Sequence, residues 1–183
     1  AFSMGNLAST YRALGRHDEA LQLEQETLAF RQRVLPENHP DIALNMGNLA
    51  VTYCALGKSS KALALFQKAL AIRYASLPAT HDDIASTLDC IACIYIARGN
   101  HAKALKFQIR LLWLHEQTLA PGDPTIVASV LAVCHSYEKC RRWDDAEAVC
   151  KAALLQLIRT VGLAHPSTAK LKARLNEIRS HRD

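Results

Sequence analysis

Two cysteines and a histidine come closest, by type and spacing, to forming a chemical site in this chain. Cys90 and Cys93 lie three residues apart, which places two thiols on one face of a helix, and His135 follows Cys93 by 42 residues. Thiolates and imidazoles are typical zinc ligands. However, no second Cys-x2-Cys pair and no His-x3-His pair accompanies them, and Cys54 would have to serve as the fourth ligand. We therefore expect small core and surface residues here, with no metal and no cofactor.

The histidines do not indicate an enzyme. A cysteine nucleophile needs a base and an orienting group held in a rigid site, whereas the eight histidines are dispersed along the chain. His39, His81 and His165 lie in the joins between repeated segments and themselves recur at the repeat spacing, which indicates a structural role. The sequence also lacks a glycine-rich phosphate loop, paired catalytic carboxylates and a Gly-x-Ser-x-Gly motif. We predict that the chain is not an enzyme.

Composition narrows the class of protein further. The chain has 183 residues, of which 50% are hydrophobic and 21% charged, so it can bury a sizeable core and is not disordered. No stretch approaches the ~18 apolar residues of a membrane span, and the first four residues carry no signal-peptide pattern. A chain of this size does not need disulfides, so the six cysteines favour reduced thiols in the cytoplasm.

The net charge of +5 is concentrated at one end. Residues 130–183 carry 10 basic and 6 acidic side chains, whereas residues 1–129 carry 12 and 11. A whole-molecule polyanion-binding protein is therefore disfavoured, and a locally basic end is expected.

A 42-residue repeat supplies the elements that must position these residues. Residues 4–45 and 46–87 are identical at 23 of 42 positions. In addition, three sets of equivalent positions, which we call columns, keep the same residue through four repeats. These columns are Tyr11, Tyr53, Tyr95, Tyr137; Ala20, Ala62, Ala104, Ala146; and Leu28, Leu70, Leu112, Leu154. We predict one array over residues 1–183, with units 4–45, 46–87, 88–129 and 130–171 and a capping helix at about 167–181.

Each unit is predicted to form two helices. Leu49, Ala50, Tyr53 and Leu56 have the spacing of one helix face, and Gly57 permits a left-handed turn after it. All six prolines lie in joins between units, where they can begin helices. The expected helices span residues 1–14, 18–34, 41–56, 60–76, 83–98, 101–119, 124–140, 144–160 and 167–181. Antiparallel pairs of this kind stack into an all-α solenoid, a right-handed superhelix.

The two ends of the array are expected to differ. The first helix leaves an apolar face uncovered, so we expect either a longer array at the N-terminus or another chain on that face. The final helix carries Lys172, Asn176 and Arg179 at positions that are apolar, small or aromatic in other units, which indicates a solvating cap. Trp113 is expected to be buried against the next unit. Trp143 is expected to fill space, with an exposed contact role as the alternative.

These columns resemble the tetratricopeptide repeat (TPR), in the long form found in kinesin light chains and their relatives. The matching residues are Met46-x2-Leu49-Ala50-x2-Tyr53, Gly57, Ala62-x3-Phe66, Ala69 and Pro78. The resemblance covers essentially the whole chain. It implies a non-catalytic scaffold that holds peptide segments of other proteins along a groove lined by the first helix of each unit.

The resemblance also implies which residues contact peptide. In kinesin light chains, an Asn on the first helix and an Arg near the end of the second do so. The matching residues here are Asn6 and Asn48, then Arg31 and Arg73. The third and fourth units depart from this pattern, with Cys90, Ala132, His115 and Leu157 at those positions. An Asn amide suits an extended backbone and an Arg suits a carboxylate, while the alternatives are a helix-bridging Asn and a solvated Arg.

The rest of the groove is predicted from first-helix residues one turn apart. The contact residues expected there include Ser9, Val51, Cys93 and His135, accompanied by Arg12, Cys54, Ile96 and Glu138. Such a surface favours a peptide with a bulky apolar anchor beside acidic residues. Three alternatives remain: a nucleic-acid-binding helical repeat, which the sequence disfavours, a regulatory array of a larger signalling or enzymatic protein, and oligomerisation through the uncovered N-terminal face.

Overall fold

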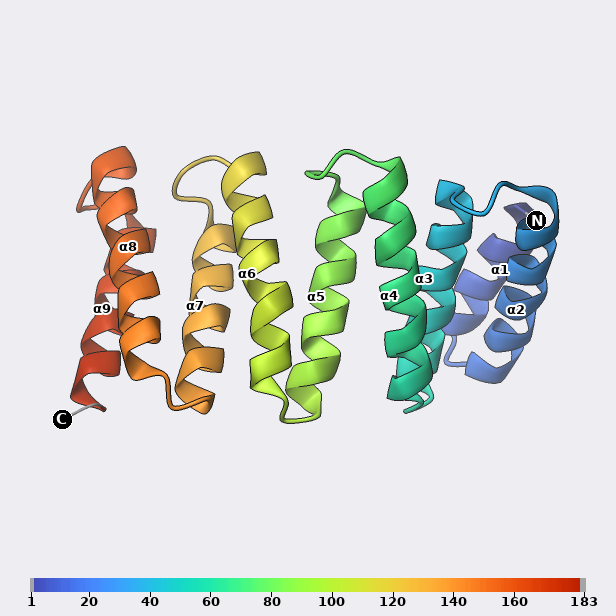
Figure 1. Ribbon diagram of the computed structural model, residues 1–183, viewed down its shortest axis with the longest axis horizontal. Coiled ribbons are helices and arrows are strands. Elements are labelled where there is room, and N and C mark those ends of the chain that lie inside the picture. The colour runs from blue at the N-terminus through green and yellow to red at the C-terminus, as the bar shows by residue number, and fades with distance from the viewer. Residues whose placement is uncertain (1, 182–183) are drawn as a thin grey trace. The chain divides into compact units, whose positions relative to one another are not determined.

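The computed structural model describes residues 2–181, and these residues form an all-α fold of helices in sequential antiparallel pairs (Figure 1). The helices of the described residues are α1 (Phe2–Ala13), α2 (His17–Val34), α3 (Pro40–Ala55), α4 (Ser59–Ser76), α5 (Asp82–Ala97), α6 (His101–Thr118), α7 (Pro124–Lys139), α8 (Trp143–Val161) and α9 (Pro166–Ser180). Each boundary lies within one residue of the predicted range, so the predicted fold class is confirmed.

Histidines and prolines in the joins begin the first helices. Pro40, Pro124 and Pro166 occupy the first turn of α3, α7 and α9, where a missing N–H is tolerated. The Nδ1 atom of His39 accepts a hydrogen bond from the backbone N–H of Asp41 at 3.1 Å. His81 and His165 cap α5 and α9 in the same way. The predicted structural role of these three histidines is thus confirmed.

A left-handed residue ends α1, α3, α5 and α7. Gly15, Gly57 and Gly99 have φ values of 74°, 70° and 69°. Arg141 occupies the fourth turn with φ 58°, a conformation that glycine adopts more easily than any other residue. The backbone bonds of the turn are the same: Gly57 N–H donates to Cys54 O at 2.9 Å, and Arg141 N–H donates to Glu138 O at 2.8 Å.

The chain divides into two compact units, and the first covers residues 1–94. Within it α1 packs on α2, α2 on α3, and α3 on α4. Small residues permit the close approach of the helices: Ala20, Ala50 and Ala62 are completely buried. Phe66 is buried beside them, and the Tyr53 hydroxyl accepts a hydrogen bond from Gln25 Nε2 at 2.9 Å. The unit is therefore a run of helix hairpins that share one apolar core.

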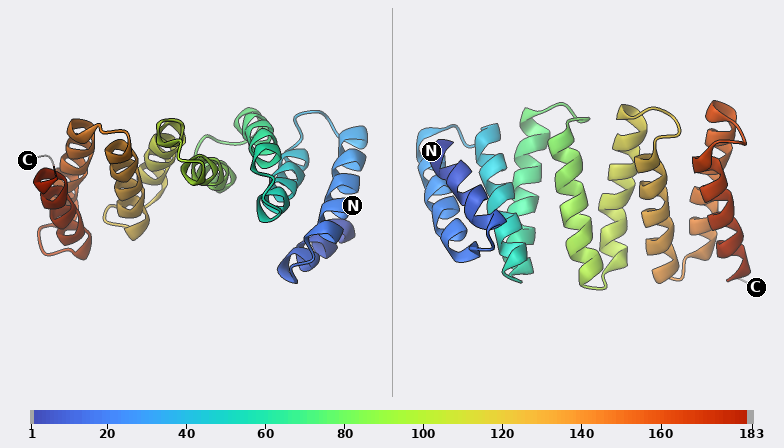
Figure 2. Two further views of the ribbon diagram at one scale, coloured as in Figure 1. Left: turned by 90° about the horizontal axis from the view of Figure 1, so that it is seen from below. Right: turned by 180° about the vertical axis from the view of Figure 1, so that it is seen from behind.

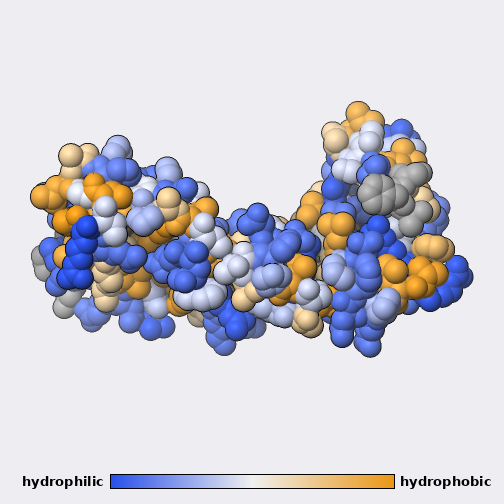
Figure 3. All heavy atoms as spheres, turned by 90° about the horizontal axis from the view of Figure 1, so that it is seen from above, coloured by the Kyte–Doolittle hydropathy of each residue, from blue (hydrophilic) through white to orange (hydrophobic). Residues whose placement is uncertain are grey.

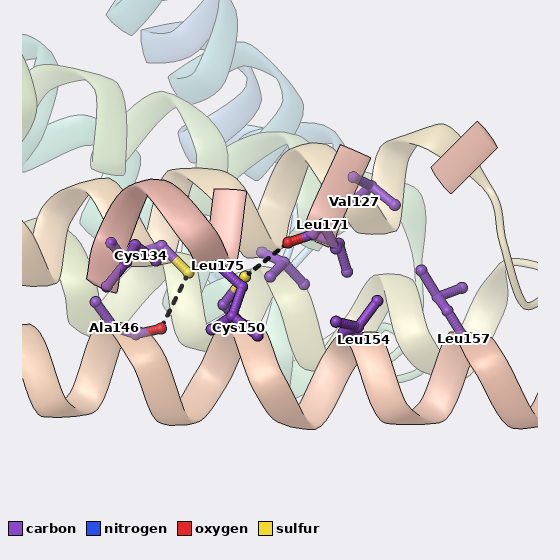
Figure 4. Packing of buried hydrophobic residues seen from close by; sticks show 10 residues of the cluster. Val127, Cys134, Ala146, Cys150, Leu154, Leu157, Leu171 and Leu175 are labelled. Carbon is purple, nitrogen blue, oxygen red and sulfur yellow. Dashed lines mark hydrogen bonds between the residues drawn. The ribbon is translucent and has the colours of Figure 1, made fainter. Parts of the chain in front are cut away.

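The second unit covers residues 95–183 and has its own core. Val127 and Val130 of α7, Leu154 and Leu157 of α8, and Leu171 of α9 belong to one buried cluster (Figure 4). Cys134 and Cys150 are completely buried in the same cluster. Their thiols donate to backbone carbonyls, Cys134 to Ala146 and Cys150 to Leu171, each at 3.5 Å. Both cysteines are free thiols that act as small core residues.

The outer helices of the two units expose different kinds of residue. On α1, Leu7 is 45% exposed, whereas Leu49, at the same position of α3, is 4% exposed because α2 covers it. On α9, Leu171 is buried while Lys172, Asn176 and Arg179 are exposed. Leu7 is therefore open on α1, whereas its equivalent on α9, Leu175, is buried and polar side chains occupy the exposed face of α9.

The prediction that Trp113 is buried is wrong. Its side chain is 50% exposed, because residue 113 lies on the outward face of α6, away from the buried Ala104, Leu111 and Leu114. Trp143 is half-buried and packs against the core cluster of the second unit, which agrees with the expected space-filling role.

No helix of residues 2–181 combines the length and the apolar character that crossing a membrane requires. On the face drawn in Figure 3, apolar side chains are interspersed with hydrophilic ones. Within each unit, successive helices run antiparallel, as the right-hand view of Figure 2 shows.

Candidate functional site

Among the predicted contact residues of the first unit, those on first helices reach the surface. Asn6 and Ser9 are exposed on α1. On α3, Asn48 is half-buried and Val51 is exposed, and Cys93 is exposed on α5. Spacings of three residues place Asn6 with Ser9, and Asn48 with Val51, on neighbouring positions of one helix face. No hydrogen bond described for the chain uses the side-chain amides of Asn6 and Asn48, so both are available to a ligand.

Arg12 joins the surface of α1 to that of α3. Its Nη1 atom donates to Glu24 Oε1 and to the backbone carbonyl of Asn48, both at 3.2 Å. Glu24 is buried, and burial raises the pKa of its carboxyl, against the opposing effects of Thr52 and Arg12. The ion pair with Glu24 and the hydrogen bond to Asn48 O hold α1, α2 and α3 together directly beside Asn48.

The structure places Arg31 and Arg73 between helices. Arg31 Nη1 donates to the backbone carbonyl of Asp41 at 3.0 Å and to the side chain of Asn45. Arg73 Nη1 repeats the arrangement with the carbonyl of Asp83 at 3.0 Å and the Thr87 hydroxyl. The two arginines are only 7% and 5% exposed. They fasten the end of each second helix to the start of the next first helix, and peptide contact by them stays a prediction that their burial does not support.

A matching contact exists in the second unit. His115 Nδ1 lies 2.8 Å from the Ser129 hydroxyl, so a histidine takes the position of the arginine. The sequence carried a signal for this role: Asp41 and Asn45 follow Arg31 by 10 and 14 residues, and Asp83 and Thr87 follow Arg73 at the same distances. Recurrence of the arginine and the aspartate, with a polar residue at the third position, indicates a contact within the chain.

The first-helix surface of the second unit has different chemistry. His135 is exposed on α7, and its ring meets that of His101 edge to face with centroids 5.9 Å apart. Burial, with the nearby His135 and Lys139, lowers the pKa of His101. Glu138 is bound by Arg174 of α9 at 2.6 Å, so its carboxylate is engaged within the chain. This surface therefore offers an imidazole pair where the first unit offers amides.

The cysteine pair and its surroundings do not assemble into a chemical centre. Cys90 is half-buried and Cys93 is exposed, and burial raises the pKa of both thiols, which keeps them protonated at neutral pH. Among residues 2–181 there is no group of three histidine, cysteine or acidic side chains that could hold a metal ion.

A cleft that sequence reasoning missed lies between the second helices of the first unit. Its volume is about 510 Å³, and its floor is formed by Ile42, Met46 and Ile72. Gln32 of α2 and Lys68 of α4 stand at its sides. Nothing in the spacing of these residues distinguishes the cleft from an ordinary packed core, because its volume depends on how far apart α2 and α4 lie.

The comparisons with known proteins agree with this architecture. Two models of the tetratricopeptide repeat family match residues 1–75 and 84–125. No curated protein sequence matches the chain significantly. Tetratricopeptide repeats generally mediate protein–protein interactions and are typically non-catalytic, and no catalytic family is identified for this chain.

Solved structures resemble it closely in fold. The nearly identical TPR-like repeats of a Podosopora anserina protein described as a kinesin light chain superpose with a TM-score of 0.76 at 23% identity, over 98% of this chain and 87% of that one. BtubC (BKLC) of P. vanneervenii gives 0.66 at 18% identity, over 98% and 79%. The apo form of RapI gives 0.71 at 12% identity, over 99% and 63%.

Proposed function

The chain belongs to the tetratricopeptide repeat family, and from that premise we propose that it is a non-catalytic scaffold that binds peptide segments of partner proteins along its first helices. The observation that carries the proposal is the pair of amides on α1 and α3. Asn6 and Asn48 recur at the repeat distance and lie on helices that Arg12 holds together, and no hydrogen bond described for residues 2–181 uses their side-chain amides. An amide provides two donors and one acceptor, which suits an extended peptide backbone.

The neighbouring residues define the peptide that fits. Val51 is 40% exposed one turn after Asn48 and offers an apolar contact. Arg12 supplies a cation, because its side chain keeps 21% of its surface exposed while it binds Glu24. We infer a ligand with a bulky apolar side chain beside an acidic residue. Ser9 and Cys93 extend the same surface on α1 and α5, and His135 extends the first-helix surface of the second unit.

The resemblance also suggests contact by Arg31 and Arg73, but their guanidinium groups are occupied by the next helix. We leave them out of the contact set and assign the recognition to the amides. The test therefore substitutes an amide, since replacing a buried arginine would disturb folding and binding together.

The experiment compares Asn48→Asp with Asn176→Asp on a peptide array of acidic and apolar sequences. Both variants replace an amide by a carboxylate, but Asn176 lies on the exposed face of α9. Loss of the amide donors and repulsion of an acidic ligand should weaken binding by Asn48→Asp at least about tenfold, equivalent to about 1.4 kcal/mol. Asn176→Asp should bind as the wild type does. Equal binding by both variants, or no enrichment of acidic and apolar sequences, would show that the assignment is wrong.

A further inference from the structure

A second exposed surface, on the second helices of the second unit, is not explained by folding. Ile109 and Trp113 on α6 are 44% and 50% exposed, and Leu155 on α8 is 47% exposed. Trp113 and Leu155 stand at the same repeat position, and Ile109 precedes Trp113 by about one helical turn. We call these three residues the Trp113 patch. Exposed large apolar residues that gather in this way mark interaction surfaces in many proteins.

The repeat itself shows that the fold does not need these side chains. At the position of Trp113 and Leu155, the helices of the first unit carry Ala29 and Ala71, which are also exposed. At the position of Ile109, they carry Gln25 and Gln67. Small and polar residues therefore satisfy the same backbone, so packing within the chain gives no reason for a tryptophan and two aliphatic residues.

A shallow groove connects the two helices that bear the patch. A recess of about 40 Å³ is lined by Glu116 of α6, by Leu119 directly after α6, and by Ala153 and Gln156 of α8. Its floor is the first turns of α7, which packs between α6 and α8 (Figure 1). Glu116 follows Trp113 by one turn, and Gln156 is next to Leu155, so the recess lies beside the patch. A groove between two helices that run in the same direction can receive a third helix.

The charges around the patch are mostly positive. Lys106 and Arg110 are exposed on α6, and Lys151 and Arg159 are exposed on α8, one turn on each side of Leu155. The second unit as a whole has 14 basic and 8 acidic residues, whereas the first unit has 8 and 9. Glu116 is the one acid among the residues that line the recess, and burial raises its pKa.

We propose that the Trp113 patch binds an acidic amphipathic helix of a partner protein, whose apolar side chains cover Ile109, Trp113 and Leu155 and whose acidic side chains meet the flanking lysines and arginines. In such an interface the central apolar residues provide most of the affinity, and the complementary charges around them orient the partner. Ile109 and Leu155 are aliphatic and offer no face on which a nucleic-acid base could stack, so a protein helix fits better than a single-stranded nucleic acid.

The test uses the full chain and fluorescently labelled helical peptides. One library carries leucine or phenylalanine on one face and aspartate or glutamate on the other, and each member has a scrambled version and a version with lysine in place of the acids. Trp113→Ala is the test variant, because alanine is the residue that α2 and α4 carry at this position. Val51→Ala is the matched control, since it truncates an exposed apolar residue of the first-helix surface.

We expect acidic helical peptides to bind, lysine versions not to bind, and binding to weaken with salt. Trp113→Ala should reduce affinity at least about tenfold with an unchanged circular dichroism spectrum. Val51→Ala and Asn48→Asp should bind the acidic helical peptides as the wild type does, although both change the first-helix surface, so failure of this proposal is distinguishable from failure of the first-helix function.

Four results would overturn the proposal. The first is equal affinity of Trp113→Ala and the wild type, and the second is a library in which no acidic helix binds better than its scrambled version. The third is a dimer of the chain alone that Trp113→Ala dissociates, which would make a second copy the occupant. The fourth is binding of single-stranded RNA with the same dependence on Trp113.

Discussion

Arg141→Gly should stabilise the second unit. Arg141 has the left-handed backbone that Gly99 adopts in the equivalent turn of the same unit, with φ 58° against 69°. A side chain in this conformation costs about 1–2 kcal/mol of stability, which the change to glycine removes. The greater freedom of glycine in the unfolded chain lowers the stability by about 0.4–1 kcal/mol, so part of the gain is lost. Arg141 is exposed, and no hydrogen bond or ion pair of its side chain is described. The change in the free energy of unfolding therefore depends mainly on the backbone conformation. The net gain should be about 0.5–1 kcal/mol.

The measurement is urea unfolding followed by tryptophan fluorescence. Both tryptophans, Trp113 and Trp143, lie in the second unit, so their emission reports on that unit while far-ultraviolet circular dichroism reports on all helices. The melting temperature should rise by about 1–4 °C for a chain of this size.

The reverse substitution, Gly99→Arg, is the matched control. A Cβ at Gly99 meets no atom within 4 Å, so any loss of stability comes from the backbone conformation and not from a clash. It should destabilise the second unit by a similar amount. If Arg141→Gly lowers the fluorescence midpoint, or if Gly99→Arg leaves it unchanged, the assignment of strain to this turn is refuted.

Three further predictions follow from buried groups. Arg73→Met should destabilise the first unit by about 2–4 kcal/mol, because Asp83 O and the Thr87 hydroxyl lose a buried charged donor; circular dichroism should detect the loss while the tryptophan transition stays in place. Burial raises the pKa of Glu24 above its ordinary 4.5, so the folded state binds this proton more tightly and loses stability as the pH rises through the raised pKa. The stability of Glu24→Gln relative to the wild type should therefore increase as the pH rises from 4.5 through the raised pKa, and a difference that does not grow with pH would contradict this. Cys134 and Cys150 are completely buried, and the hydrogen bond with Cys150, together with burial, raises the pKa of the Cys134 thiol, so a thiol reagent should label both only after unfolding; labelling of the native protein at either would show that the core opens.

The helices could be predicted within one residue because each boundary has a local chemical cause. Proline begins helices, glycine permits the turns that end them, and a repeat of 42 residues reports the same boundary several times. Arg141 shows the strength of the repeat: its turn forms without glycine, because the flanking helices impose it.

Side-chain environments were harder to predict. Arg31 and Arg73 suggested surface cations, yet they are buried because partners on the following helix bind them. Trp113 suggested a core residue because of its size, whereas its position relative to Leu111 and Leu114 puts it on the outward face. In both cases residue type misled, and helical phase or recurrence with spaced partners was the better guide.

The segments Met4–Tyr11 and Met46–Tyr53 have the same residue at seven of eight positions, yet Leu7 is 45% exposed and Leu49 is 4% exposed. Intrinsic helix propensity is therefore nearly equal in α1 and α3, and what differs is the covering by a neighbouring helix. Hydrogen exchange at matched amides of the two segments compares one sequence in two settings within one molecule. Because α1 itself packs on α2, the ratio of their exchange rates measures what the additional covering of α3 contributes to helix stability, and α1 is a built-in reference for that contribution.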